Sequence, residues 1–277
     1  MGRFLAEHPL TRNSQLRAWR RVLRWQIESR LKEEVIVPWV GGQKLAVRRH
    51  MTGATGNIYA GLHEFADMGL VLHFLRRGDL FFDVGSNVGT YSVLASGVCG
   101  ATTWAFEPHP ETVLRLERNV AINHLSDRIK IYQLALGSEA AEVSFTIGLD
   151  TMNKVSNDGT GSLKVIQKPL DALVNDAFPI MIKVDVEGYE EDVVRGALSV
   201  LANSHLRVVE LETVTPWTLK TMKDHGFEQA YYNPILRTLS SQSNFAGPSN
   251  TTFIRDPDFV ADRVKSAEAI QIFDRLI

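Results

Sequence analysis

The chain has 277 residues, of which 44% are hydrophobic and 22% are charged, a composition typical of a globular protein with a full core. Its formal net charge of −2 does not favour a general affinity for nucleic acid. The single cysteine, Cys99, excludes an intrachain disulfide and a cysteine zinc cluster, and it suits a reducing cytoplasm. No apolar run is long enough to predict a transmembrane helix or the core of a secretory signal.

Residues 1–45 are predicted to be a basic amphipathic extension in front of a main domain at residues 46–277. Residues 1–32 carry eight basic side chains and two glutamates, a charge of +6, which leaves −8 for the remainder of the chain. Apolar residues recur there at steps of three and four, as in an amphipathic helix: Leu16, Trp19, Leu23, Ile27 and Leu31. Such a helix either lies on an anionic membrane surface or packs its stripe on the domain or on a second subunit.

Residues 52–57 predict a glycine-bearing loop, and residues 58–77 predict a helix. His63, Glu64 and Asp67 are expected close together on the solvated surface of this helix. The spacing of four between His63 and Asp67 allows the two side chains to pair. A metal site would need more ligands than these residues offer.

A buried strand, a tight turn and a helix start are predicted at residues 80–91, LFFDVGSNVGTY. Gly85 and Gly89 lack a Cβ, so the backbone can turn sharply there and approach a ligand closely. Turns at the carboxyl ends of parallel strands bind nucleotide-like ligands, although every α/β protein has such turns. Asp83 at the strand end favours a cationic or hydroxyl-rich ligand.

A second strand, at residues 102–108, ends at Glu107, which lies 18 residues beyond Gly89. An acid at about this distance accepts hydrogen bonds from ribose hydroxyls in nucleotide-binding units. The dinucleotide motif G-x-G-x-x-G is not met, because Asn87 stands between Gly85 and Gly89. S-adenosylmethionine, an adenosine without a pyrophosphate, therefore fits better than NAD.

Alternating strands and helices continue to the end of the chain and predict a doubly wound, mostly parallel sheet with helices on both faces. The further strands are expected at residues 129–134, 180–184, 206–211, 229–232 and 251–255, and residues 142–147 and 161–168 are expected to form an inserted hairpin. The further helices are expected at residues 110–121, 170–174, 189–202, 216–225 and 256–277. The long polar segment at residues 148–160 is either a lid beside the ligand or plain disorder.

Four motifs in this order resemble the FkbM family of S-adenosylmethionine-dependent methyltransferases. They are DVGSNVGTYS from residue 83, AFEPHPET from residue 105, LALGS from residue 134 and IMIKVDVEGYE from residue 180. The segment TGATGNIYAGLHEF at residues 52–65 resembles the one that precedes this domain in the family. The resemblance spans about residues 45–255 and implies a class I, Rossmann-like methyltransferase fold of seven strands, one antiparallel at the edge.

The resemblance also implies which residues surround the cofactor and the acceptor. For S-adenosylmethionine these are Asp83, Gly85, Asn87 and Gly89 at the methionine part, Glu107 at the ribose, Gln133 and Ala135 at the adenine, and Glu64 as a further pocket residue. Asp185 and Glu187 are expected to face the methyl group, and His63, Asn153 and Glu212 are the candidates for the acceptor.

An acceptor hydroxyl needs a base or a metal ion to take up its proton. We predict a metal-free site with Asp185 as the base and Glu187 as second choice, because no dense carboxylate cluster appears in the sequence. Two alternatives stay open. A Mg²⁺-like ion could bridge these acids and those at Glu210 and Glu212, or Asp185 could only cap the following helix.

The sequence thus predicts an O-methyltransferase that releases S-adenosylhomocysteine. Its expected partner is a hydroxyl of a sugar, a glycan or a polyketide-like metabolite, and no nucleic acid. A cytoplasmic location is predicted, with a peripheral contact at the inner membrane face through residues 1–32 and a homodimer as open alternatives. The competing functions are a nucleic-acid methyltransferase, a NAD-dependent dehydrogenase with an atypical glycine loop, and a non-catalytic adaptor.

Overall fold

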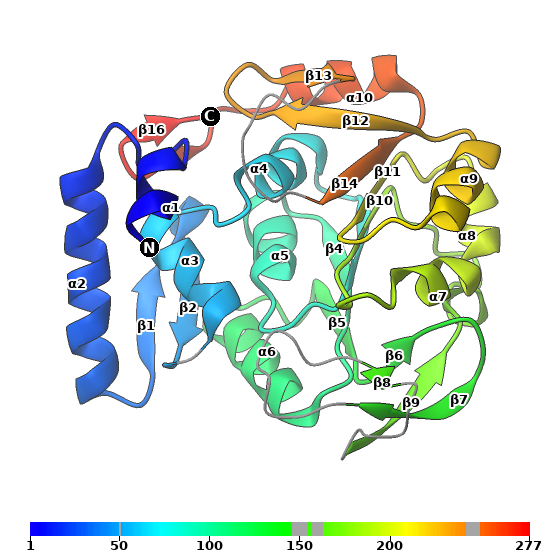
Figure 1. The fold of residues 1–277 in the computed structure, drawn as a ribbon, viewed down its shortest axis with the longest axis horizontal. Helices are drawn as coiled ribbons and strands as arrows, with labels where there is room; N and C mark the ends of the chain where they lie inside the picture. The colour runs from blue at the N-terminus through cyan, green and yellow to red at the C-terminus, as the bar shows by residue number, and fades with distance from the viewer. Residues whose placement is uncertain (50, 146–154, 157–162, 242–249) are drawn as a thin grey trace.

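The computed structural model describes residues 1–277 except 50, 146–154, 157–162 and 242–249 (Figure 1). Its centre is a sheet of eight strands in the order β13-β12-β14-β11-β10-β3-β4-β5. The five parallel strands are β3 (Leu80–Val84), β4 (Thr102–Phe106), β5 (Ile129–Tyr132), β10 (Met181–Val184) and β11 (Val208–Leu211). The remaining strands are β12 (Glu228–Asn233), β13 (Thr238–Ser240) and β14 (Thr251–Ile254). The pairs β11–β14, β14–β12 and β12–β13 are antiparallel.

This strand order confirms the predicted doubly wound, mostly parallel sheet. The antiparallel strand that was expected at the edge is β14, and it lies inside the sheet, antiparallel to both β11 and β12. The short strand β13 pairs with β12 and adds one strand to the seven that were expected. Since β3 stands between β10 and β4, the carboxyl ends of three strands that carry motifs lie side by side.

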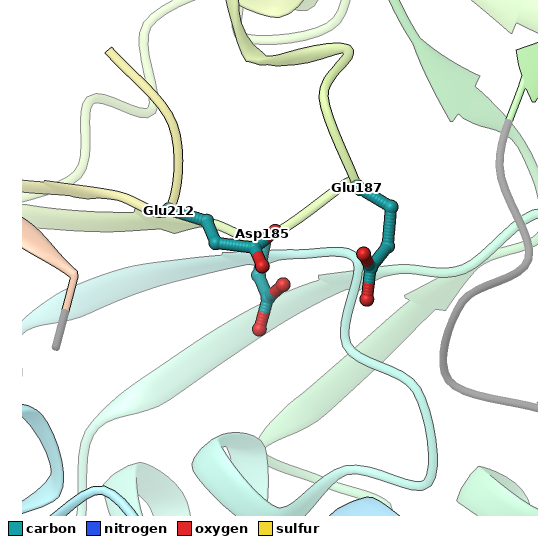
Figure 2. A group of neighbouring side chains, drawn as sticks. All are labelled: Asp185, Glu187 and Glu212. Atoms are coloured by element: carbon teal, nitrogen blue, oxygen red, sulfur yellow. The ribbon is translucent and has the colours of Figure 1, made fainter. Parts of the chain in front are cut away.

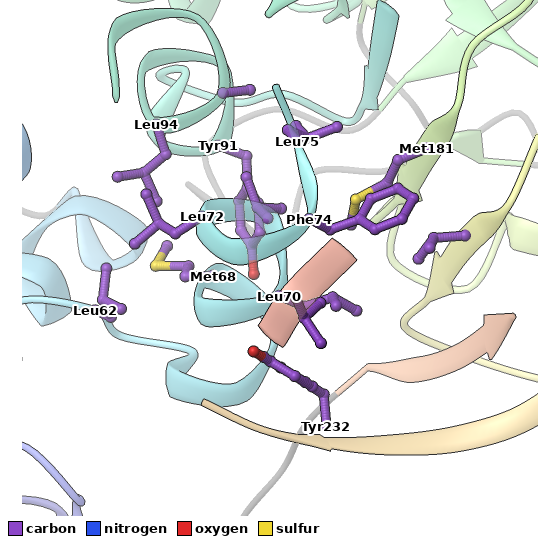
Figure 3. Packing of buried hydrophobic residues seen from close by; sticks show 14 of the residues in the cluster. Leu62, Met68, Leu70, Leu72, Phe74, Leu75, Tyr91, Leu94, Met181 and Tyr232 are labelled. Atoms are coloured by element: carbon purple, nitrogen blue, oxygen red, sulfur yellow. The ribbon is translucent and has the colours of Figure 1, made fainter. Parts of the chain in front are cut away.

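Helices cover both faces of the sheet, because adjacent strand residues point to opposite sides. Phe81 packs under α4 (Phe65–Phe74), α5 (Thr90–Val93) and α10 (Pro257–Lys265), in the cluster that Figure 3 shows. Phe82 packs on the other face. The helices of that face are η4 (Leu170–Ala172), α7 (Glu190–Arg195), α8 (Leu198–Ala202) and α9 (Pro216–Asp224). Helix α6 (Pro110–Ile122) packs beside β4 and β5.

A smaller sheet follows β5 in the order β6-β9-β7-β8. Its strands are β6 (Ala135–Leu136), β7 (Ala141–Phe145), β8 (Val155–Ser156) and β9 (Leu163–Lys168). The antiparallel pairing of β7 with β9 confirms the predicted inserted hairpin. Most of the segment at residues 148–160, including Asn153, lies outside the described residues.

The extension contains α1 (Gly2–Glu7), α2 (Gln15–Leu31), β1 (Val35–Pro38), η1 (Val40–Gly42) and β2 (Lys44–Val47), and α3 (Thr52–Ala60) follows it. The predicted amphipathic helix is present, but the predicted stripe does not face the protein. Its buried residues are instead Ala18, Val22, Trp25 and Ser29. The β1–β2 hairpin crosses the predicted boundary at residue 45, so the division into two domains stays a prediction.

Two predicted helices are each divided in the structure. The loop expected at residues 52–57 is helical, and the helix expected at 58–77 is split between α3 and α4. The chain turns between them at Gly61, whose φ is 89°. The helix expected at 189–202 is split into α7 and α8, where the carbonyl of Gly196 accepts a hydrogen bond from Asp171 N–H.

The expected C-terminal helix at residues 256–277 ends at Lys265. The hairpin of β15 (Gln271–Ile272) and β16 (Arg275–Leu276) follows it. The Arg237 guanidinium donates to the carbonyls of Glu268 and Ile277, and these bonds hold the tail in a non-helical path. In the part of the chain that the structure describes, no helix has the length and apolar character needed to cross a membrane.

Candidate active site

A cavity of about 360 Å³ opens at the carboxyl ends of β3, β4 and β10. This volume is within the range of small-molecule sites. Ten of the residues predicted for the site line the cavity: His63, Glu64, Asp83, Gly85, Asn87, Glu107, Ala135, Asp185, Glu187 and Glu212. Three predicted residues are not among them. Gly89 lies behind the turn as the N-cap of α5, Gln133 is exposed outside the cavity, and Asn153 is outside the described residues.

The turn after β3 lies in close contact with the turn after β10. Gly85 has a φ of +76°, and a Cβ there would stand 1.8 Å from the carbonyl oxygen of Asp185. The backbone N–H groups of Gly85 and Ser86 both donate to the carbonyl of Phe106, at 3.0 Å. Asn87 also has a positive φ, of 50°. The two turns therefore lie too close together to admit a side chain at position 85.

Glu107 is 6% exposed and accepts backbone hydrogen bonds on both carboxylate oxygens. Asn87 N–H donates at 3.0 Å and His109 N–H at 2.9 Å. A carboxylate offers about four acceptor positions, so about two remain for a ligand. Burial raises the pKa of Glu107 to about 7, although these hydrogen bonds act in the opposite direction.

A row of charged groups crosses the three central strands. Lys183 on β10 pairs in register with Asp83 on β3 and with Glu210 on β11. Lys183 is 2% exposed, and its Nζ lies 2.5 Å from Asp185 Oδ2 and 4.3 Å from the ring centroid of Tyr91. Burial lowers the pKa of Lys183, but the carboxylates around it outweigh that effect and raise it. Lys183 is thus a buried ammonium that compensates the acids of the site.

Lys183 was not predicted from the sequence, although a signal was present. A single lysine interrupts the apolar strand residues Met181, Ile182 and Val184. Residues two apart in a strand point to the same side, so Lys183 and Asp185 were placed to meet. A lysine inside a buried strand requires a buried acid as its partner.

Two acids of the central strands, Asp83 and Glu210, are deeply buried, and Glu64 is half-buried. Asp83 accepts a hydrogen bond of 2.5 Å from Ser92 Oγ, and burial raises its pKa to about 6. Tyr91 donates its hydroxyl hydrogen to Glu64 at 2.6 Å. Glu210 is fully buried, and burial raises its pKa well above the ordinary value.

The prediction that Asp67 lies on a solvated surface with His63 is wrong. Asp67 is 2% exposed and accepts hydrogen bonds from the backbone and side-chain nitrogens of Asn250, at 3.2 and 3.3 Å. Because α4 begins only at Phe65, His63 precedes the helix and is exposed. Burial raises the pKa of Asp67 to about 8.

Three carboxyl groups meet where β10 and β11 end: Asp185, Glu187 and Glu212 (Figure 2). One oxygen of each lies within 4.8 Å of the others. Burial, with the charge of Asp185 next in weight, raises the pKa of Glu212 to about 8. Burial acts the same way on Asp185, but the Lys183 ammonium outweighs it and lowers the pKa of Asp185. The Lys183 ammonium thus favours the ionised form of Asp185 at neutral pH.

Oxygen ligands in such a group suit a hard divalent cation. The Lys183 ammonium already compensates the charge of Asp185 at 2.5 Å, which a metal ion would otherwise do. The metal-free site stays a prediction, and the ground given for it is wrong, because three carboxyl groups do meet here.

The sheet order, and the cavity at the carboxyl ends of β3, β4 and β10, are those of the class I methyltransferase fold. Residues 83–242, more than half of the chain, match the family model of the Methyltransferase FkbM domain. The chain belongs to this family, as the motifs predicted.

Two curated relatives are similar to this chain. Hexuronic acid methyltransferase AglP of Haloferax volcanii is 34% identical over 152 residues, 51% of this chain and 59% of that protein. Methyltransferase 1 of Beauveria bassiana is 27% identical over 143 residues, 41% of this chain and 56% of that protein. The chain thus spans less than two thirds of both relatives. A crystal structure of an FkbM methyltransferase from Methylobacillus flagellatus is 16% identical, with a TM-score of 0.43 and coverage of 64% of this chain and 43% of that one.

Proposed function

We propose that the cavity binds S-adenosylmethionine and that the protein transfers its methyl group to a hydroxyl oxygen of a sugar or glycan. The observation that carries this proposal is the meeting, in one cavity, of the Gly85 turn, the Glu107 carboxylate and the Asp185 carboxylate. The first two suit an adenosine with an extended amino-acid arm, and the third suits an acceptor hydroxyl.

The acidic lining supports this cofactor over a dinucleotide. S-adenosylmethionine carries a sulfonium and an ammonium, which the carboxylates of Asp83, Glu64 and Asp185 in the cavity lining attract. A pyrophosphate at the same turn would be repelled by Asp83, which disfavours the NAD-dependent dehydrogenase. Family membership disfavours the nucleic-acid methyltransferase as well.

Each part of the cofactor has a proposed set of residues. The turn from Gly85 to Gly89 would surround the methionine arm, and Glu107 would accept from the ribose hydroxyls. Ala135 and its neighbour Leu134 offer apolar surface to the adenine. The side chain of Gln133 is exposed outside the cavity, so it is left out of this set.

When bound, S-adenosylmethionine supplies an electrophilic methyl carbon whose bond to sulfur breaks as the acceptor oxygen bonds to it. Asp185 takes up the hydroxyl proton, and Lys183 keeps Asp185 ionised for this task. Glu212 and Glu187 bind the other hydroxyls of the acceptor. Holding the two reactants in line contributes at most about 7–11 kcal/mol, and a positioned base roughly 100- to 10,000-fold in rate.

A sugar acceptor is favoured by two independent points. The similar protein of Haloferax volcanii is named a hexuronic acid methyltransferase, and its matched segment includes half of this chain. The acceptor end of the cavity presents carboxyl oxygens, which accept hydrogen bonds from vicinal hydroxyls.

Replacing Glu107 with glutamine should weaken S-adenosylhomocysteine binding by about 1.5–3 kcal/mol, roughly tenfold to 150-fold, because charged hydrogen bonds to the ribose are lost. Titration calorimetry of the full chain measures this. Glu111→Gln is the matched control, because Glu111 is an exposed acid on the first turn of α6. Equal affinities for Glu107→Gln and the parent would contradict the ribose assignment.

The affinity for S-adenosylhomocysteine should rise with pH and level off above about 7. The folded pKa of Glu107 is raised to about 7, so the neutral form is favoured below that pH. The ionised form accepts from both ribose hydroxyls, so binding releases a proton and is favoured as the pH rises. Calorimetry between about pH 5.5 and 8.5 tests this. If Glu107→Gln kept the same slope, another acid such as Asp83 would be responsible.

A further inference from the structure

The outer face of α2 carries a row of exposed apolar side chains. Leu16 is 82% exposed, Leu31 77%, Leu23 and Ile27 each 59%, and Trp19 40%. They recur at steps of three and four, so they share one side of the helix along its whole length. Scattered surface leucines are normal, but a continuous row marks an interaction surface.

The orientation of this row is fixed by the opposite face of the helix. Ala18, Val22 and Trp25 are buried in a cluster that includes residues of β1, β2 and α3. The Arg21 guanidinium donates to the carbonyl of Tyr59 at 2.8 and 2.9 Å and lies 3.8 Å from the ring centroid of Phe273. In Figure 1, α2 forms the left edge of the molecule. The apolar row therefore points away from the protein.

Arginines are interspersed in the row. The helix holds five arginines and one glutamate. Arg20 is four residues from Leu16 and three from Leu23, and Arg30 is three residues from Ile27, so both lie on the exposed side. The outer face of α2 thus combines aliphatic side chains with positive charge.

We propose that the outer face of α2 docks on an anionic lipid surface. A helix with such a face lies in the membrane interface, with its leucines at the acyl boundary and its arginines at the lipid phosphates. Seventeen residues span about 25 Å, and a planar surface contacts the whole row at once. A second copy docked by a two-fold axis would bring the same arginines together, so repulsion disfavours that occupant.

The test is co-sedimentation of the full chain with vesicles of phosphatidylcholine alone and with about one-third phosphatidylglycerol added. We expect binding only to the anionic vesicles, and weaker binding as salt is raised. The double change Leu23→Glu and Ile27→Glu should lower the apparent affinity at least tenfold. Arg20→Gln should lower it roughly fivefold, since each basic residue near the surface contributes about 1 kcal/mol.

The matched control is the double change Leu114→Glu and Leu219→Glu, at exposed leucines of α6 and α9. It adds the same charge elsewhere and should leave vesicle binding as in the parent. The melting temperature of each variant confirms that it is folded. Equal binding by the α2 and control variants, or equal binding to neutral vesicles, would overturn the proposal. Light scattering that shows a dimer in the parent and a monomer in the α2 variant would assign the face to a second copy and also overturn it.

Discussion

Asp185→Asn should lower kcat by roughly 100- to 10,000-fold, because the acceptor hydroxyl loses the group that takes up its proton. Asparagine keeps the shape of the side chain but is no base. Lys183 would then lose its nearest counter-charge, since its Nζ lies 2.5 Å from Asp185 Oδ2. The affinity for S-adenosylhomocysteine should change far less than kcat, because Glu107 and the Gly85 turn remain.

The measurement is the initial rate of S-adenosylhomocysteine formation with a panel of hexuronosides and neutral hexosides as acceptors. Asp224→Asn on the exposed side of α9 is the matched control and should have the parent rate. Glu187→Gln tests the second candidate base. The parent should keep its rate in EDTA. A rate lost in EDTA and restored by Mg²⁺ would contradict the metal-free site, and a fully active Asp185→Asn would contradict the choice of base.

Gly85→Val should abolish measurable S-adenosylhomocysteine binding and lower the melting temperature. A Cβ at position 85 would meet the carbonyl oxygen of Asp185 at 1.8 Å, so the two turns that form the cavity would separate. The positive φ adds a strain of about 1–3 kcal/mol for a residue with a side chain. Gly85→Ala gives a milder version of the same change if the valine variant does not fold.

Gly78→Val separates the effect of backbone strain from the effect of the clash with Asp185. Gly78 also has a positive φ, of +91°, but a Cβ there would meet nothing within 4 Å. Its variant should lose stability through strain alone and bind S-adenosylhomocysteine like the parent. Thermal melting and calorimetry of the pair measure both effects. If Gly85→Val bound normally, the turn after β3 would not belong to the site.

The sequence alone determined the central sheet and ten of the residues that line the cavity. Strands β3, β4 and β10 are short apolar runs that end in a turn or an acid. Such runs can be recognised in a sequence because strands that are buried on both faces are apolar along their whole length. Asp83 lies near the end of β3, and Glu107 and Asp185 come directly after β4 and β10. The parallel order brings their carboxyl ends together, so residues far apart in the sequence could be predicted to meet.

Only the tertiary structure decided which groups are buried and which charges compensate one another. Asp67 is buried, and it accepts hydrogen bonds from Asn250, which is 183 residues away in the sequence. The contact between Lys183 and Asp185 lowers the pKa of Asp185. Burial, together with the charge of Asp185, raises the pKa of Glu212.

The amphipathic helix shows the same division. Its existence was legible from the spacing of its apolar residues, but Leu16, Leu23 and Ile27 are exposed, whereas Val22 and Trp25 are buried. Two apolar sets at helical spacing occur in this segment, and periodicity alone does not tell which one packs. Val22 and Trp25 are the buried set because they pack against residues of β1, β2 and α3. Those partners come together only in the folded chain, so the sequence of the helix does not reveal them.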